Sequence, residues 1–248
     1  MSKVGIMNNF VITGFNESYW QKWGISWLAS LKHIAKHDPN QIIIFGYDLS
    51  PGTQKKIVES GIQLLPGKYS GDIRSDTLFA ICELASKKPG IYVYWDADVY
   101  FQEDISEIFK LANEDILVSS NQNHGFLAAP DYQWFYMKDL FKLISFVGDT
   151  ATIHECLFGS FQKFTVQVDN TWNFVDLPRL KNNEDLLTYK DKVQKVIHPS
   201  GHLKLLLNNR NILFWELHKD LYNKFLDKKK STPHKLMMHN QIALNDKQ

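Results

Sequence analysis

The stretch YVYWDADV, residues 92–99, decides the fold of this chain. Its first four residues are aromatic or β-branched and a Lys-Pro-Gly break at 88–90 precedes it, so we predict a buried strand over residues 91–95. Asp96 and Asp98 follow that strand, at the end where open α/β sheets bind their ligands. Two carboxylates this close repel each other unless a cation binds both, which favours Mn²⁺ or Mg²⁺.

The length and composition indicate a globular protein of one large domain. The 248 residues suffice to bury a substantial core. Hydrophobic residues make up 44% of the chain and charged residues 22%, as is ordinary for a globular protein. The 28 lysine and arginine residues nearly balance the 27 acidic residues, so the charge provides no case for nucleic acid as the main partner.

The cysteines and the N-terminal residues bear on the cellular compartment. Cys82 and Cys156 form no disulfide framework and no metal-binding spacing, as expected in a reducing compartment. The first residues, MSKVG, show no signal-peptide pattern, and no apolar run reaches the roughly 18 residues that a membrane span needs. We therefore expect a cytoplasmic protein.

The first half of the chain alternates predicted strands and helices. Strands are predicted over residues 9–13, 41–47, 62–65 and 91–95, and helices over 51–60 and 73–86. A further helix is predicted to open at a capping box, Ser18-x-x-Gln21. Its apolar stripe consists of Trp20, Trp23, Gly24, Trp27, Leu28 and Leu31. The alternation predicts an α/β fold with a mainly parallel sheet and helices on both faces.

The second half is less regular. Strands are predicted over residues 116–119, 126–129 and 193–198, and helices over 132–146, 153–164, 203–207 and 214–228. No repeat or low-complexity linker divides the chain, so we predict a single domain over 1–248. Within it we expect a nucleotide-binding half over 1–100, an acceptor and sugar half over 101–210 and a C-terminal helical tail over 211–248.

A second motif, HPSGHLK at residues 198–204, bears on the Asp-x-Asp pair. Alone, that pair would suggest a solvated turn, because such turns are rich in aspartate. In the second motif, the imidazole of His198 can complete the ligands of a cation, Gly201 lets backbone approach a phosphate, and Lys204 can neutralise it. A turn with a surface histidine and lysine is the alternative, and the conjunction with Asp96 and Asp98 argues against it.

Together the two motifs resemble those of the retaining GT-A glycosyltransferases, the family that includes glycogenin and the bacterial lipooligosaccharide galactosyltransferases. This resemblance implies a GT-A fold with a Rossmann-like mixed sheet. It also implies that Asp96, Asp98 and His198 ligate Mn²⁺ (or Mg²⁺), as the two aspartates and the histidine do in that family. The backbone of Gly201 and the side chain of Lys204 would contact the diphosphate of the donor.

The segment TGFNESY, residues 13–19, is similar to the family's first strand-to-helix turn, where an acidic residue binds uracil and a tyrosine stacks on it. Asn16 stands in place of the acid, and an amide oxygen can still accept from uracil N3–H. The resemblance therefore implies a UDP-sugar donor. The expected donor contacts are Thr13, Gly14, Phe15, Asn16, Tyr19, Arg74 and Ala97. The segment NTWN, residues 170–173, resembles the family's Trp-Asn element.

The reacting sugar is expected to meet three further residues. Asn123, in Asn-His-Gly, stands where the family has an Asn-Ala-Gly turn that contacts the transferred sugar. Glu155 aligns with the family's acidic pair near the reacting carbon, although a solvated helix residue is an equal alternative. Arg74 opens the helix before the metal strand, where a guanidinium suits a diphosphate or a sugar and a surface ion pair explains the same letter. We take Glu155, Arg74 and Asn123 as the candidate catalytic residues.

The resemblance implies a metal-dependent glycosyltransferase that moves a hexose, from UDP-glucose or UDP-galactose, to a glycan or lipid-linked saccharide with retention. A non-catalytic nucleotide-sugar or glycan-binding module is one alternative. A nucleotidyltransferase is another, although the Gly-rich basic loop usual in that class is missing after the first strand. Residues 215–230 carry apolar residues at 217, 221 and 225 and a basic end, which suits either a membrane surface or packing on the domain. No oligomeric state is predicted.

Overall fold

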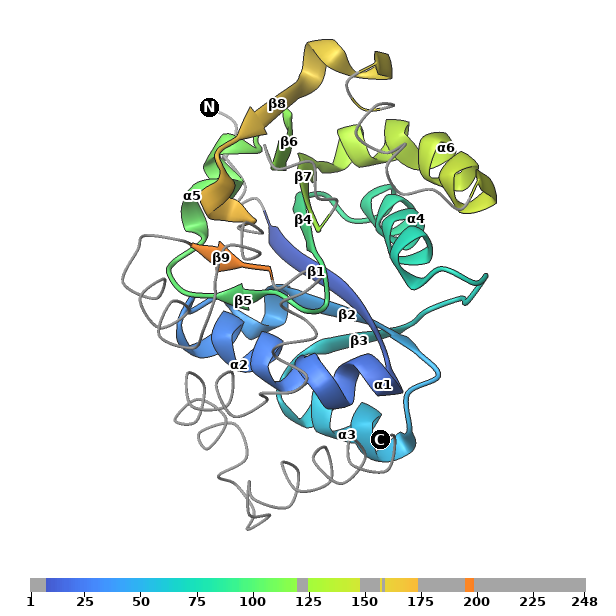
Figure 1. Ribbon diagram of the computed structural model, residues 1–248, viewed down its shortest axis with the longest axis vertical. Coiled ribbons are helices and arrows are strands. Elements are labelled where there is room, and N and C mark those ends of the chain that lie inside the picture. The colour runs from blue at the N-terminus through green and yellow to red at the C-terminus, as the bar shows by residue number, and fades with distance from the viewer. Residues whose placement is uncertain (1–7, 120–124, 148–156, 158, 174–194, 199–248) are drawn as a thin grey trace, which may run out of the picture.

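The computed structural model describes residues 8–119, 125–147, 157, 159–173 and 195–198. Its centre is a seven-stranded sheet with the strand order β3-β2-β1-β4-β7-β6-β8 (Figure 1). The strands are β1 Asn9–Asn16, β2 Ile42–Tyr47, β3 Gln63–Pro66, β4 Ile91–Trp95, β6 Ile116–Ser119, β7 Phe126–Pro130 and β8 Thr165–Val168.

Most neighbouring strands of this sheet run parallel. The pairs β1–β2, β2–β3, β1–β4 and β6–β8 are parallel, and β7 runs antiparallel to both β4 and β6. Parallel neighbours need crossover connections, and helices provide them in the first half of the chain. The predicted strand over residues 91–95 is β4, at the middle of the sheet, and the predicted mixed α/β architecture is confirmed.

Helices cover both faces of the sheet, as predicted. Helices α4 Ile73–Ala85 and α6 Asp131–Val147 lie side by side on one face (Figure 1). The opposite face packs against α2 Ile25–His33, α3 Pro51–Glu59 and α5 Ser106–Leu111. Strand β4 serves both cores because successive side chains alternate: Tyr92 and Tyr94 face α4 and α6, while Val93 and Trp95 face the other layer.

The first helical region begins differently from the prediction. β1 continues through Asn16, and the side-chain oxygen of Asn16 caps α1 Glu17–Tyr19 by accepting from the Tyr19 N–H at 2.8 Å. The predicted capping box at Ser18 is therefore wrong, because the chain has already entered the helix at Glu17. A π-helical turn, Trp20–Gly24, then leads into α2, and the predicted apolar stripe is buried.

Two short strands bring distant segments together, and the sequence predicted one of them, β9, as part of the strand expected over residues 193–198. Strand β5 Tyr100–Phe101 pairs antiparallel with β9 Val196–Ile197, so Tyr100 lies opposite Ile197. The predicted helix over 153–164 was wrong at its end, because a 3₁₀ turn over Gln162–Phe164 leads straight into the unpredicted β8.

None of the helices in the described part of the chain is long and apolar enough to cross a membrane.

Candidate metal and nucleotide site

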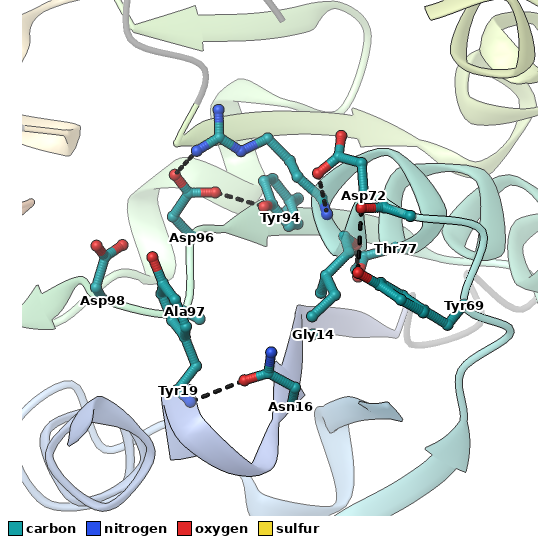
Figure 2. A pocket seen from close by; sticks show the side chains of 13 residues that line it. Gly14, Asn16, Tyr19, Tyr69, Asp72, Thr77, Tyr94, Asp96, Ala97 and Asp98 are labelled. Carbon is teal, nitrogen blue, oxygen red and sulfur yellow. Dashed lines mark hydrogen bonds and ion pairs between the residues drawn. The ribbon is translucent and has the colours of Figure 1, made fainter. Parts of the chain in front are cut away.

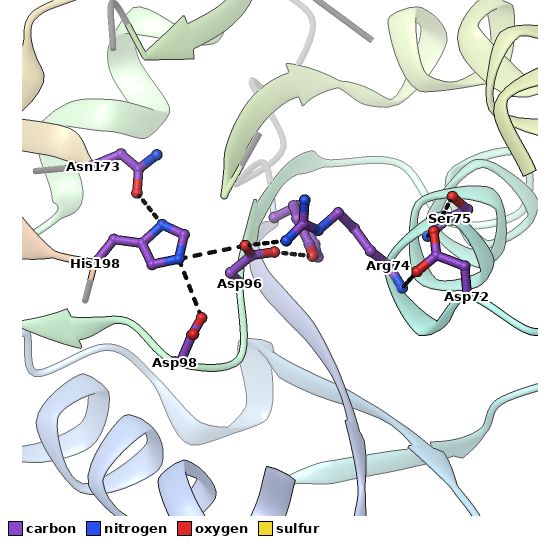
Figure 3. Close-up of polar contacts among 8 residues, drawn as sticks. Asp72, Arg74, Ser75, Asp96, Asp98, Asn173 and His198 are labelled. Carbon is purple, nitrogen blue, oxygen red and sulfur yellow. Dashed lines mark hydrogen bonds and ion pairs between the residues drawn. The ribbon is translucent and has the colours of Figure 1, made fainter. Parts of the chain in front are cut away.

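Two carboxylates and one imidazole converge at the end of β4 (Figure 3). His198 Nε2 lies 3.2 Å from Asp98 Oδ1 and 3.5 Å from Asp96 Oδ2. One candidate ligand atom from each residue lies within 4.8 Å of the other two, and all three side chains are buried. The structure therefore brings together the three residues that the sequence assigned to a metal.

The backbone explains how residues about a hundred positions apart meet. Asp96 directly follows β4, and its N–H donates to the Gly125 carbonyl at 2.8 Å, which ties the turn to the start of β7. Asp98 lies two residues further on, just before β5. Because β9 pairs with β5 and ends at Ile197, the next residue, His198, comes to lie beside Asp98.

Asp96 has two further partners. Arg74 reaches from the first turn of α4 and places its Nη2 3.0 Å from Asp96 Oδ2, while the Tyr94 hydroxyl donates to Asp96 Oδ1 (Figures 2 and 3). The pKa of Arg74 is raised, mainly because the negative charge of the Asp96 carboxylate stabilises the protonated guanidinium. Burial first, and Asp96 second, raise the pKa of Tyr94, so the phenol keeps its proton and acts as a donor.

The donor set fits a hard divalent cation. Two carboxylates and one imidazole are ligands that Mn²⁺ accepts readily, and Mg²⁺ suits the carboxylates. Nε2 of His198 faces both carboxylates, so a lone pair there would be repelled unless a proton or a cation lies between. A divalent cation satisfies all three groups, and Asp96, Asp98 and His198 could hold it.

Asn173 completes the back of the site. Its side-chain oxygen lies 3.0 Å from His198 Nδ1, and both residues are buried. The preceding residue, Trp172, accepts a hydrogen bond from the indole N–H of Trp95 at 3.0 Å. The Trp-Asn element at 170–173 marked this segment in the sequence, but its contact with His198 could not be predicted because it depends on tertiary packing.

A pocket of about 260 Å³ opens beside the carboxylates (Figure 2). Among the expected donor-binding and metal residues, those that line it are Gly14, Asn16, Tyr19, Arg74, Asp96, Ala97 and Asp98. They come from the end of β1, the end of α1, the start of α4 and the turn after β4. The strand-to-helix turn after β1 and the metal motif therefore share one cavity.

Two of the expected donor contacts do not line this pocket. Thr13 and Phe15 are fully buried, and Phe15 packs edge-to-face against Trp20 and Trp27 in the core. The reason is that β1 extends through Asn16, so side chains alternate and Gly14 faces the pocket while its two neighbours point away. The side chains of Thr13 and Phe15 therefore do not line this pocket, and the expected contact of these two residues with a donor stays a prediction.

The acidic neighbour of Asn16, Glu17, is not among the residues that line the pocket. Glu17 accepts from the Ser50 N–H at 2.8 Å and from the Thr53 hydroxyl at 2.9 Å, which holds the start of α3. Asn16 Oδ1, which already accepts from the Tyr19 N–H, keeps a second lone pair. Asn16 is therefore the side chain of this pair that remains at the pocket.

Further pocket residues were not named as site residues from the sequence: Tyr69, Gly71, Asp72, Ile73, Thr77 and Tyr94. Asp72 caps α4 by accepting from the N–H groups of Arg74 and Ser75, each at 3.2 Å, which fixes the turn that carries Arg74. An aspartate before a predicted helix was the signal that could have found it. Gly14 lets α4 approach, because a Cβ there would lie 2.2 Å from Thr77 Oγ1.

Four expected site residues lie outside the residues that the structure describes. They are Asn123, Glu155, Gly201 and Lys204. The predicted helices over 203–207 and 214–228, Cys156 and the basic end of the tail lie outside them as well. Their roles stay predictions from the sequence.

Solved structures with a similar fold are glycosyltransferases. The apo form of the glycosyltransferase GlyE from Streptococcus pneumoniae TIGR4 superimposes with a TM-score of 0.58 at 16% identity, over 90% of this chain and 64% of that one. The galactosyltransferase LgtC, in complex with donor and acceptor sugar analogs, has a TM-score of 0.56 at 13% identity, over 91% and 98% of the two chains. Mouse xyloside xylosyltransferase 1 has a TM-score of 0.50 at 10% identity, over 80% and 99%.

These similarities establish the fold. The chain has the α/β GT-A fold that these glycosyltransferases share, as the two sequence motifs predicted. It spans 64% of the length of the GlyE structure. No family model and no curated protein sequence matches the chain.

Proposed function

We propose that this chain is a metal-dependent glycosyltransferase that transfers a hexose from a UDP-sugar to a saccharide acceptor. The observation that carries the proposal is the convergence of Asp96, Asp98 and His198 beside a pocket that Asn16 and Tyr19 also line. The GT-A fold supports it, because the solved structures that share the fold are glycosyltransferases. LgtC was solved with donor and acceptor sugar analogs, which supports a nucleotide sugar and a saccharide as the two substrates here.

The pocket offers a place for each part of a nucleotide sugar. The half-exposed ring of Tyr19 provides a face for a base, and Asn16 provides an amide for its polar edge. The diphosphate would lie at the carboxylate end, where Asp96, Asp98 and His198 would hold Mn²⁺ or Mg²⁺, which would supply positive charge to the leaving group. Arg74, whose side chain is 31% exposed, offers a guanidinium at the same end.

For residues outside the described part of the chain, the proposed roles rest on the family resemblance alone. The Gly201 backbone and Lys204 would receive the diphosphate, which gains negative charge as the glycosidic bond breaks. Asn123 would contact the transferred sugar and Glu155 would lie near the reacting carbon, with retention of configuration. A glycan or a lipid-linked saccharide would be the acceptor. A cytoplasmic location, with contact to a membrane surface through residues 215–230, is likewise inferred from the sequence.

The first prediction concerns Asp98. In Asp98→Asn, a carboxylate ligand becomes a neutral amide, so we expect Mn²⁺-dependent UDP binding to be lost and UDP release from UDP-glucose or UDP-galactose to fall by about a hundredfold or more. Calorimetry measures the binding and a coupled assay measures UDP. Asp104→Asn is the matched control, because Asp104 is an exposed carboxylate six residues downstream that accepts from the Ser106 N–H at 2.7 Å, outside the site.

Three outcomes would contradict the proposal. If wild-type protein bound UDP equally well with and without Mn²⁺, the proposed dependence on a metal would be wrong. Pyrophosphate rather than UDP as the product would identify a nucleotidyltransferase. Metal-dependent UDP binding without turnover of any UDP-sugar, in the presence of saccharide acceptors, would identify a binding module.

A further inference from the structure

We infer that Asn173 is a positioning residue, which sets the tautomer and the orientation of His198 so that Nε2 faces the two carboxylates. The inference rests on the proposed metal site and deepens it. An amide oxygen accepts hydrogen bonds but cannot donate them, so the 3.0 Å contact between Asn173 Oδ1 and His198 Nδ1 requires the proton on Nδ1. The other ring nitrogen, Nε2, then presents its lone pair to a cation held by Asp96 and Asp98.

The position of Asn173 is itself fixed by a closed circuit of contacts. Trp95, the last residue of β4, donates from its indole N–H to the carbonyl of Trp172, the residue directly before Asn173. Figure 3 shows the contact between Asn173 and His198. Asn173 contacts His198, and His198 contacts Asp96, the residue after Trp95. The circuit therefore ties Asn173 to the same turn that carries the carboxylates.

The segment that carries His198, residues 195–198, is hydrogen-bonded to the turn that carries Asn173 and to Gln102. The Lys195 N–H donates to the Thr171 carbonyl at 3.0 Å, and the Gln102 N–H donates to the Lys195 carbonyl at 2.8 Å. The Lys195 ammonium also lies 4.1 Å from the centre of the Trp172 ring. Residues 171–173 thus contact the segment 195–198 twice: Thr171 binds its backbone, and Asn173 orients the imidazole of His198.

Burial makes this contact matter. Asn173 is fully buried and His198 is 2% exposed, so a water molecule from bulk solvent cannot readily replace the amide oxygen. In metal sites generally, the partner of the second histidine nitrogen changes metal affinity by about 10–100-fold when it is removed. We expect an effect of this size on Mn²⁺ binding here.

The test compares three proteins. Asn173→Leu keeps the size of the side chain but removes the acceptor, so the Kd for Mn²⁺, measured by calorimetry or by electron paramagnetic resonance, should rise about 10–100-fold. Asn173→Asp restores an acceptor for Nδ1–H and should bind Mn²⁺ much more tightly than the leucine variant. Gln133→Met is the matched control: it removes another buried side-chain amide, which lies on α6 and donates to the Glu114 carbonyl, and it should bind Mn²⁺ as wild type does.

A measurement on the wild-type protein tests the tautomer without any substitution at Asn173. In ¹⁵N-histidine-labelled protein loaded with Mg²⁺, His198, identified by the loss of its signals in His198→Gln, should carry its proton on Nδ1. A proton on Nε2 with bare Nδ1, or an Asn173→Leu variant that binds Mn²⁺ as tightly as wild type, would overturn the inference while the metal site itself stands. Wild-type protein without Mn²⁺ affinity would overturn the proposed function and this inference together.

Discussion

The carboxylate of Glu17 shows how a single residue near the pocket supports the structure. Burial acts to raise the pKa of Glu17, but hydrogen bonds from Ser50, Gln21 and Thr53 outweigh it and hold the pKa below its usual range. A lowered pKa in the folded state means that the ionised carboxylate stabilises the fold above the unfolded pKa of about 4.3. This contribution is lost as the pH falls through the folded pKa.

The Glu17→Gln variant tests this role. The carboxylate accepts from Ser50, Thr53 and Gln21 with its two oxygens, whereas a glutamine amide has one oxygen that can accept and a nitrogen that cannot. We therefore expect a loss of about 1–2 kcal/mol of unfolding free energy at pH 7. The difference from wild type should shrink as the pH drops below about 4.3. Urea unfolding at several pH values measures it. Glu59→Gln is the control, since Glu59 forms an exposed ion pair with Lys55 at 3.8 Å; equal losses in both variants would contradict the role of Glu17.

At this scale the sequence identified residues better than it identified contacts. Asp96, Asp98 and His198 were predicted as metal ligands, and the structure brings them together. Tyr94 and Asn173 were not predicted as their partners. A tyrosine in a strand and an asparagine in a turn have many common uses, and only their distances to Asp96 and His198 show which use applies here.

Among the elements, the helical region after β1 depends on close packing at Gly24. A Cβ on Gly24 would lie 2.2 Å from Cε3 of Trp20, and Trp20 is buried against Phe15. The absence of a side chain at Gly24 therefore lets the π-helical turn fold back on its own tryptophan. The intrinsic preference of helices for alanine over glycine acts in the opposite direction.

The Gly24→Ala variant decides which effect dominates. We expect a loss of about 1–3 kcal/mol, because the buried Trp20 ring must shift out of its packing. In Gly52→Ala, in α3, nothing lies within 4 Å of the added Cβ, so stability should be unchanged or rise by up to about 1 kcal/mol. Thermal and denaturant unfolding of both variants compare them. A stabilised Gly24→Ala protein would show that the turn tolerates the methyl group.

Element prediction succeeded where a pattern was long enough to show a period. The strands β2 and β4 and the helices α4 and α6 were predicted close to their bounds, and β1 was predicted with its correct start. Strand β9 lies within the strand predicted over residues 193–198, whereas the two-residue strand β5 was missed, because two residues show neither alternation nor a turn signal. The end of β1 was misplaced, because Gly14 and Asn16 are turn-prone residues that tertiary pairing with β2 keeps extended.

For the whole molecule, a bound cation should join two parts of the chain that are far apart in sequence. A ligand that binds only the assembled site stabilises it by about 2.7 kcal/mol when present at a hundred times its Kd. Because Asp96 and Asp98 lie beside β4 and β5 while His198 follows β9, opening of the β5–β9 pair would release the ion. The metal should therefore slow local opening of this pair.

Hydrogen exchange measures this coupling. With saturating Mn²⁺, amides of residues 96–101 and 195–198 should exchange up to about a hundredfold more slowly, while residues 51–59 of α3, which provide no ligand, should not change. The Asp98→Asn variant should show no protection from Mn²⁺. Uniform protection of the whole chain, or protection of 96–101 without 195–198, would contradict a shared site.

The sequence alone determined the central strand, the two-faced α/β architecture and the identity of the three candidate ligands. These features follow from local residue types: aromatic and β-branched runs favour strands, and paired carboxylates require a cation. Only the tertiary structure decided that β5 and β9 pair, that His198 thereby comes within 3.2 Å of Asp98, and that Asn173 orients it. The physical reason is that contacts between distant segments depend on how both pack against a common sheet, and no local pattern records that packing.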